Sequence, residues 1–351
     1  MQLSIVIMNS PHNSELSNLN QSKNGTTADD DSSAAGSYYA LLVTNIVICC
    51  LNLIGNITVL ILICKRRLLG RTTNVFIFSL AMADAICSIW AIPYNYHLAI
   101  GKSMSVYLCK TYFYALCVSR TAVAYTVILL TTEKILNILH PSRFITAGRC
   151  MFFITLVWFF SSAYNIWAVV FYTIYDSDTI TADELLSESG RIMYGKSCFF
   201  SHRFNSLRMI FMSLDLCILF ILPCAVLALE CCVIVRKQHG SIKQRFETYF
   251  YIMRFIFFIF VVYMLCHTPF EIATLAKSGL RGENDGVNTF YEISTTIYYT
   301  RGLFFLVVYM YFKQYVCRRN KLKNANNKTQ LDLPYRRHCR GLSLNEFRTN
   351  R

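Results

Sequence analysis

The chain has 351 residues, 54% of them apolar, and a formal net charge of +14 at pH 7. Soluble domains average roughly 45–50% apolar residues and spread them at helical or strand periods, whereas here they form long blocks. The 15 cysteines are scattered and lie mostly inside these blocks, so composition argues against a soluble domain, a disulfide scaffold and a zinc site alike.

The first 38 residues are expected to form a disordered extracellular tail. Residues 9–36 are rich in Asn, Ser, Thr and Asp, which is typical of disorder. The apolar stretch at 1–8 lacks a basic flank and a long core, so it does not resemble a cleaved signal peptide. Asn20 and Asn24 begin sequons and are candidate glycosylation sites.

Seven segments are apolar and long enough to cross a bilayer as helices, which takes about 20 residues. They are residues 39–64, 72–97, 103–132, 150–175, 209–235, 248–276 and 287–312. No internal repeat is evident, which disfavours an inverted-repeat transporter. The sequence predicts an all-α membrane protein whose residues 39–312 form a seven-transmembrane helix bundle.

Basic residues gather on one side of the predicted membrane. Lys and Arg follow the first, third, fifth and seventh spans, whereas Asp and Glu dominate the other side. The basic side is therefore expected to be the cytoplasm. The net charge then reflects topology, and no nucleic-acid partner is expected.

Residues 313–351 are expected to form a cytoplasmic amphipathic helix and a basic tail. Residues 311–323 mix apolar and basic side chains, which suits a short helix lying on the anionic inner leaflet, with membrane lipids as partners. Cys317 is a palmitoylation candidate.

Seven short motifs or single residues stand out along the chain. They are Leu53-Ile-Gly-Asn56, Ser79-Leu-Ala-Met-Ala-Asp84, Cys109, Glu133-Lys-Ile-Leu-Asn-Ile-Leu-His-Pro141, Trp158, Phe220-Ile-Leu-Pro223 and Cys266-His-Thr-Pro-Phe270. Together they resemble the signatures of rhodopsin-like (class A) G-protein-coupled receptors, over roughly residues 39–317. The resemblance implies a plasma-membrane receptor with an extracellular ligand, a heterotrimeric G protein and arrestin as partners. It also implies a disulfide between Cys109 and Cys198.

Three departures from this pattern affect the positions that couple ligand to G protein. Lys134 stands where the family pattern has an Arg just after the third span, so the planar, bidentate guanidinium is replaced by an ammonium. In the sixth span, His267 replaces the Trp of the family pattern. In the seventh span, Phe305-Leu306 replaces the Asn-Pro of that pattern, although Tyr309 is kept. A non-signalling, ligand-binding receptor is therefore the main alternative, and a transporter or channel is a second one.

Asp84 and Arg301 are charged residues inside predicted spans, where charges are functional by default. In the family that the chain resembles, the carboxylate at the position of Asp84 binds sodium. We expect Arg301 to replace the ion by pairing with Asp84, because a buried carboxylate needs a partner. The alternative is that Arg301 snorkels or faces a polar cavity.

Arg120 lies fourteen residues before Lys134, on roughly the same face of a helix. We expect it near the floor of the ligand pocket, with Asp215 or Glu271 as its partner. Whether these charges contact the ligand or only hold three helices together is left open.

The ligand is expected to be a peptide, in particular a neuropeptide, and a basic one. Leu116 stands where amine receptors carry an aspartate, and residues 287–312 contain no lysine, so neither an amine receptor nor an opsin is indicated. The long second loop and the acidic outer face favour a basic peptide. The pocket is expected to include Leu116, His267, Phe270, Tyr94 and His97, although Tyr94 equally suits interfacial packing.

On the inner face, Glu133 and Lys134 are expected to hold the resting state, with Glu247 as a second partner of Lys134. Pro141 and Tyr309 complete the predicted G-protein site. We expect activation to move the sixth span, residues 248–276, about Pro269, which removes a backbone donor. No catalytic or metal-binding motif is present, so neither an enzyme nor a cofactor is indicated.

Overall fold

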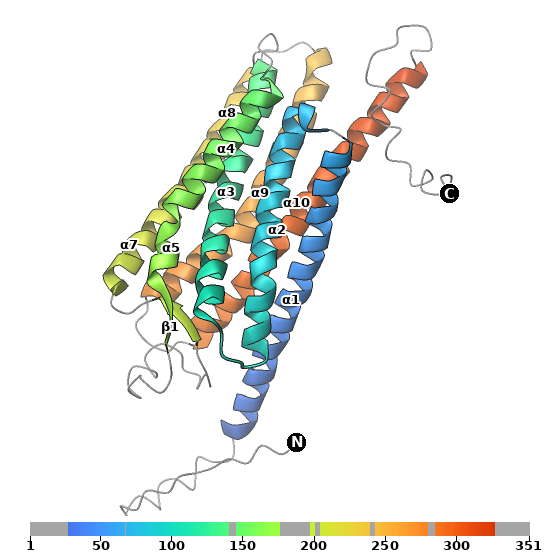
Figure 1. Ribbon diagram of the computed structural model, residues 1–351. Helices are drawn as coiled ribbons and strands as arrows, with labels where there is room; N and C mark the ends of the chain where they lie inside the picture. Colours follow the sequence, from blue (N-terminus) through green and yellow to red (C-terminus); the bar gives the residue numbers. More distant parts are fainter. Residues whose placement is uncertain are drawn as a thin grey trace, which may run out of the picture.

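The computed structural model describes residues 27–66, 68–139, 145–175, 197–200, 204–238, 243–279 and 285–326. Nearly all of them are helical (Figure 1). The helices are α1 (Thr27–Lys65), η1 (Leu68–Gly70), α2 (Thr72–Ala99), α3 (Val106–Leu139), α4 (Ala147–Tyr164), α5 (Ile166–Phe171), α7 (Asn205–Asp215), η4 (Leu216–Ile221), α8 (Leu222–Gln238), α9 (Lys243–Gly279) and α10 (Asp285–Asn326). Two short strands, β1 (Tyr172–Tyr175) and β2 (Ser197–Phe200), pair antiparallel at one end.

The helices form seven rods that lie side by side (Figure 1). α4 and α5 together make the fourth rod, and α7, η4 and α8 make the fifth. α3 occupies a central position, in contact with α2, α4, α5, α8 and α9, while α10 packs against α9, α1 and α2. The predicted seven-helix bundle is confirmed.

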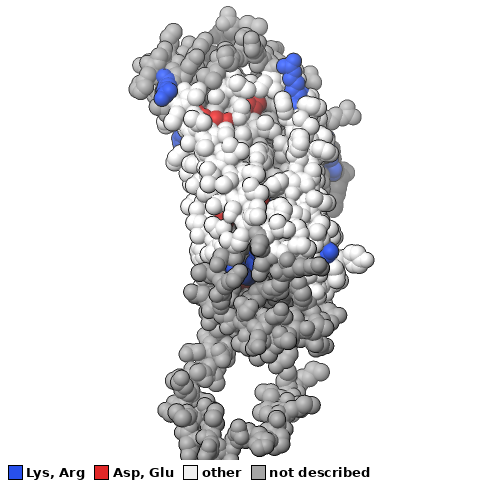
Figure 2. Space-filling model, turned by 90° about the vertical axis from the view of Figure 1, so that its left-hand side faces the viewer, with Lys and Arg blue, Asp and Glu red and all other residues white. Residues whose placement is uncertain are grey.

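Six of the rods are long and apolar enough to cross a membrane, and together they identify a multi-pass membrane protein. They cover Gly36–Lys65, Thr72–Ala99, Val106–Asn137, Ala147–Phe171, Leu207–Val233 and Arg254–Lys277. Within the described residues, α10 is the rod that does not reach this apolarity. It carries Arg301 and several tyrosines and threonines that face the bundle. The face in Figure 2 is mostly white along its middle, and most of its blue side chains lie toward its two ends.

Two helix boundaries differ from the sequence prediction. α1 begins at Thr27, twelve residues before the predicted span. α10 continues without a break to Asn326, so the predicted short amphipathic helix is not a separate element. No Pro or Gly occurs between residues 303 and 326 to interrupt it.

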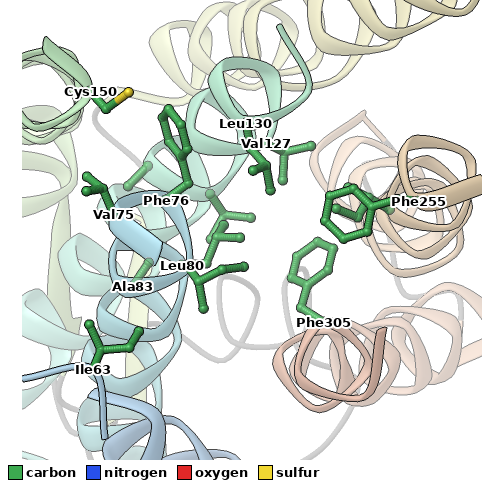
Figure 3. Close-up of a cluster of buried hydrophobic side chains, with 14 of the residues drawn as sticks. Ile63, Val75, Phe76, Leu80, Ala83, Val127, Leu130, Cys150, Phe255 and Phe305 are labelled. Atoms are coloured by element: carbon green, nitrogen blue, oxygen red, sulfur yellow. The ribbon is translucent and has the colours of Figure 1, made fainter. Parts of the chain in front are cut away.

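The largest apolar core is built mainly from α2 and α3, and α1, α4, α8, α9 and α10 each add one or two side chains (Figure 3). Phe255 of α9 and Phe305 of α10 point toward each other, and Val127 and Leu130 of α3 lie beside them. Phe305 stands where the resemblance predicted an asparagine, so this position of α10 belongs to the apolar core instead of a polar network.

The fifth rod is irregular around Pro223. Its η4 segment is π-helical, and Pro223 has no N–H to donate to the Leu219 carbonyl four residues earlier. The buried Tyr263 hydroxyl of α9 donates to that carbonyl instead, and the Tyr125 hydroxyl of α3 donates to the Ile218 carbonyl at 3.3 Å. The irregular segment is therefore anchored to two neighbouring helices.

α1 and α10 approach closely at two glycines. A Cβ at Gly302 would lie 2.2 Å from Oδ1 of Asn52, and one at Gly55 would lie 2.9 Å from Leu306. Asn52 in turn donates to Ser88 of α2 and accepts from Asn56. A larger residue at Gly302 would displace this buried polar contact between three helices.

Candidate functional site

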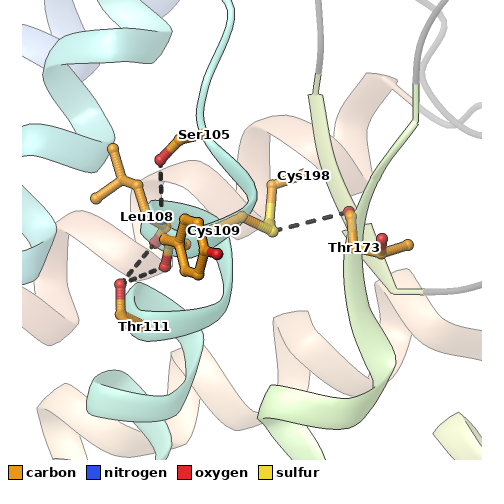
Figure 4. Close-up of a disulfide and its surroundings, with 7 residues drawn as sticks. Ser105, Leu108, Cys109, Thr111, Thr173 and Cys198 are labelled. Carbon is orange, nitrogen blue, oxygen red and sulfur yellow. Dashed lines mark hydrogen bonds between the residues drawn. A yellow bond between two sulfur atoms is a disulfide. The ribbon is translucent and has the colours of Figure 1, made fainter.

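A disulfide joins Cys109, in the first turn of α3, to Cys198 of β2, with the two Cα atoms 5.7 Å apart (Figure 4). Cys198 lies opposite Ile174 in the β1–β2 ladder, and the Cys109 sulfur lies 3.7 Å from the Thr173 carbonyl oxygen. The predicted bridge is present, and it fixes the β-hairpin to α3. We call this end of the bundle the disulfide end.

Arg120 of α3 is the centre of a buried ion cluster. It donates to Oδ2 of Asp215 in α7, and its Nη1 lies 3.1 Å from Oε1 and 3.4 Å from Oε2 of Glu271 in α9. The Tyr164 hydroxyl of α4 donates to Oδ1 of Asp215 at 2.8 Å. We call these four residues the Arg120 cluster; it joins four of the seven rods.

The Arg120 cluster carries one more negative than positive charge when both carboxylates are ionised. Arg120 and Glu271 are each 4% exposed and Asp215 is 0% exposed, so water does not screen them. The sequence left the choice between Asp215 and Glu271 open, and the structure places both carboxylates on Arg120.

Aromatic side chains surround the other predicted pocket residues. Tyr94 stacks on Tyr112 with ring centroids 3.8 Å apart, and the hydroxyls of Tyr112 and Tyr299 lie 2.6 Å apart. His97 has a buried Nδ1 that finds no hydrogen-bond partner within the described part of the chain. Leu116 is buried in the same apolar cluster as Phe270.

A second buried ion cluster involves Arg301 of α10. Its Nη2 donates to Oδ1 of Asp84 in α2 at 2.5 Å, and its Nη1 lies 3.2 Å from Nε2 of His267 in α9. Since a guanidinium only donates, Nε2 of His267 accepts and the ring proton is on Nδ1. The guanidinium carbon also lies 4.5 Å from the Tyr298 ring centroid. We call these four residues the Arg301 cluster.

At the opposite end of the bundle, Glu133 and Lys134 pair with each other at 2.9 Å. Thr72 donates to Glu133 at 2.6 Å, and the Lys134 ammonium donates to Thr73. Both threonines begin α2, so the pair is held to α2. Tyr309 of α10 likewise donates to Asn74 of α2, at 3.2 Å.

Several predicted residues cannot be placed. Asn20, Asn24 and Pro141 lie outside the described residues, and the side chains of Glu247 and Cys317 are not described. The predicted Glu247–Lys134 contact therefore stays a prediction.

Sequence reasoning missed Tyr164 and Tyr298, which complete the two clusters, and the threonines that hold Lys134. A tyrosine inside an apolar span carries a hydroxyl that needs a partner when buried, and this was the available signal for Tyr164. Tyr298 contributes its ring, for which the sequence offers no such signal.

Comparison with known proteins agrees with this architecture. Residues 55–304 match the model of the 7 transmembrane receptor (rhodopsin family). The trissin receptor of Drosophila melanogaster is 28% identical over 122 residues, which cover 33% of this chain and 18% of that receptor. The neuropeptide Y receptor type 1 of Xenopus laevis is 29% identical over 116 residues, or 32% of each chain. The dopamine D2-like receptor of Drosophila melanogaster is 26% identical over 118 residues, or 32% of this chain and 13% of that receptor.

Each of these matches thus spans a third or less of the relative's length. The family match is broader: it runs from α1 into α10 and covers the disulfide end and both ion clusters. The chain therefore belongs to the rhodopsin family of seven-transmembrane receptors.

Proposed function

We propose that this receptor binds an extracellular peptide with a basic group and signals to a heterotrimeric G protein. Its N-terminus would lie outside the plasma membrane, and arrestin would be a further partner. The disulfide end would then face the ligand, and the end that carries Glu133 and Lys134 would face the G protein.

The observation that carries this proposal is the make-up of the Arg120 cluster, which has two acidic side chains and one basic side chain. Two buried carboxylates share one guanidinium. A buried negative charge without a full counter-charge is unfavourable. A cationic group of a ligand would complete the cluster, so complementary charge favours a basic ligand.

Two points favour a peptide over a small amine. Leu116, at the position where amine receptors carry an aspartate, is buried in an apolar cluster with Phe270. One relative is named as a neuropeptide Y receptor, although another is a dopamine receptor. The absence of the aspartate at Leu116 decides the preference.

Signalling would depend on movement of α9. This helix contains Pro269 in its interior and contributes Glu271 to one cluster and His267 to the other. A ligand that rearranges the Arg120 cluster would change what holds α9 in place, and the pivot at Pro269 would carry the change to the opposite end.

The alternative is a receptor that binds its ligand without signalling. Lys134 favours this alternative, because it is held to α2 through Thr73 and offers an ammonium in place of a forked guanidinium. The Arg301 cluster favours it too, since it ties α9 to α2 and α10.

The test is to express the chain in cells and screen a library of basic and acidic peptides for G-protein activation and arrestin recruitment. Asp215→Asn removes one negative charge from the Arg120 cluster and is expected to lower the potency of a basic agonist by about tenfold or more, which corresponds to roughly 1.4 kcal/mol. Tyr164→Phe is the matched control, because it loses the hydrogen bond to Asp215 and keeps the charge.

The outcomes separate the candidate functions. Binding of a basic peptide with neither signal would favour the non-signalling receptor, and ion flux without a ligand would favour a channel or transporter. The proposed ligand class would be contradicted if the most potent agonist were acidic and had the same potency at the Asp215→Asn receptor as at the unmodified receptor.

A further inference from the structure

The Arg120 and Arg301 clusters are joined by two stacked aromatic rings. The guanidinium carbon of Arg120 lies 5.9 Å from the centroid of the Phe270 ring. Phe270 stacks on Tyr298, with centroids 4.6 Å apart and planes at 29°. The Tyr298 ring in turn lies 4.5 Å from the guanidinium carbon of Arg301. The order is guanidinium, ring, ring, guanidinium, and it runs from α3 through α9 to α10.

This stack is shielded from water along its whole length. Arg120, Phe270, Tyr298 and Arg301 are 4%, 3%, 1% and 2% exposed. Cation–π attraction is larger when the cation is desolvated. Protein interiors are also close-packed, so a ring that moves must displace the ring stacked on it. A displacement of Arg120 is therefore transmitted through Phe270 to Tyr298 by close-packed contacts.

α9 provides a second connection between the clusters. His267 and Glu271 lie four residues apart, so they occupy the same face of this helix, about 5–6 Å from each other. His267 contacts Arg301, and Glu271 contacts Arg120. A shift or rotation of α9 therefore changes both contacts together.

We infer that the Phe270–Tyr298 stack couples the two clusters, so that a change in the Arg120 cluster alters the Asp84–Arg301 ion pair. Phe270 and Tyr298 are positioning residues in this scheme. A basic ligand group that attracts Glu271 would draw it away from Arg120, Phe270 would follow, and Tyr298 would shift under Arg301. The identity of the trigger rests on the proposed function, whereas the coupling itself does not.

The test is a double-mutant cycle on the purified full-length receptor, read by thermal unfolding in detergent. Asp215→Asn perturbs the Arg120 cluster and Asp84→Asn perturbs the Arg301 cluster. Both aspartates lie outside the Phe270–Tyr298 stack, both substitutions change the side-chain shape little, and no ligand is needed. Distant sites that share no partner add in their effects. We expect the double variant to lower Tm by less than the sum of the two single shifts, by about 2 °C or more.

The role of the rings is tested by repeating the cycle in a Tyr298→Leu background, where the departure from additivity is expected to shrink because only the connection through α9 remains. Tyr299→Leu is the matched background: Tyr299 is the next residue of α10, is also buried, and contacts Tyr112. It is expected to preserve the non-additivity. The inference is overturned if the two shifts add in the unmodified receptor, or if the departure from additivity is as large in the Tyr298→Leu background as in the Tyr299→Leu background.

Milder variants keep the test possible if a carboxylate variant does not fold. Tyr164→Phe removes only the bond to Asp215, and His267→Phe removes the acceptor of Arg301 while keeping a ring beside Tyr263. A non-additive cycle in a receptor that no peptide activates would uphold the coupling and contradict the proposed function. An additive cycle would overturn the coupling whatever the ligand.

Discussion

The carboxylate of Asp84 in α2 and the guanidinium of Arg301 in α10 form a buried ion pair at 2.5 Å, although 217 positions separate them in the sequence. Both side chains are hidden from solvent inside the bundle. Neither charge could remain there alone, because an unpaired buried charge is strongly unfavourable. The pair therefore fixes how α2 and α10 face each other.

Removal of one partner of this pair is expected to destabilise the receptor. Arg301→Gln leaves Asp84 uncompensated and should lower the free energy of unfolding by about 3–5 kcal/mol. The double variant Asp84→Asn/Arg301→Gln leaves two neutral amides, so it should be more stable than Arg301→Gln alone. Thermal unfolding in detergent measures both, and a double variant that is less stable than Arg301→Gln would contradict the ion pair.

The same ion pair predicts that sodium has little effect on this receptor. In the family the carboxylate at this position binds sodium, whereas here the Arg301 guanidinium occupies its Oδ1 at 2.5 Å. Stability in about 0.15 M sodium chloride should equal that in choline chloride of the same concentration.

Arg301→Ser removes the guanidinium and leaves a small polar residue, so it should make stability depend on sodium. The choline salt controls for ionic strength. A large sodium effect on the unmodified receptor would show that Arg301 does not substitute for the ion.

The seven rods could be predicted because hydropathy over about 20 residues reports directly on the bilayer. The ends of α1 and α10 could not, because helix outside the bilayer does not need apolar residues. Thr27 and Asn326 therefore lie well beyond the predicted spans.

The Asp84–Arg301 pair could be inferred because so few charges lie inside the spans that each has few possible partners. The two partners of Arg120 were harder to predict. Asp215 directly precedes the π-helical segment, which changes the rotation of the fifth rod relative to a regular helix, and sequence spacing does not report this change. The simultaneous contact with Glu271 depends on that tertiary geometry.

A substitution at Gly302 is expected to separate α1 from α10. The Cβ of Gly302→Ala would lie 2.2 Å from Asn52 Oδ1, so Asn52 would lose its place between α1 and α2. Overpacking of this kind typically costs about 1–3 kcal/mol. Gly148→Ala in α4 is the control, because nothing lies within 4 Å of its Cβ. Equal unfolding temperatures for the two variants would argue against close packing at Gly302.

Loss of the disulfide is expected to destabilise the disulfide end. The bridge closes a loop of 89 residues, and removal of such a bond typically costs roughly 2–4 kcal/mol. Cys198→Ser should lower both the unfolding temperature and surface expression, and Cys109→Ser should match it. Cys64→Ser, at an exposed free thiol, is the control. A Cys198→Ser receptor as stable as the control would contradict a structural role for the bridge.

Lys134→Arg is expected to raise G-protein coupling. The guanidinium would offer the G protein two parallel donors, whereas the Lys134 ammonium, which pairs with Glu133 and Thr73 in this structure, offers a single point charge. One further charge-assisted hydrogen bond contributes about 1.5 kcal/mol, which corresponds to up to about tenfold in coupling affinity. Basal nucleotide exchange in membranes measures the change without a ligand. Lys134→Gln removes the charge and should lower exchange at equal expression; if neither variant differs from the unmodified receptor, Lys134 does not contact the G protein and the non-signalling alternative is favoured.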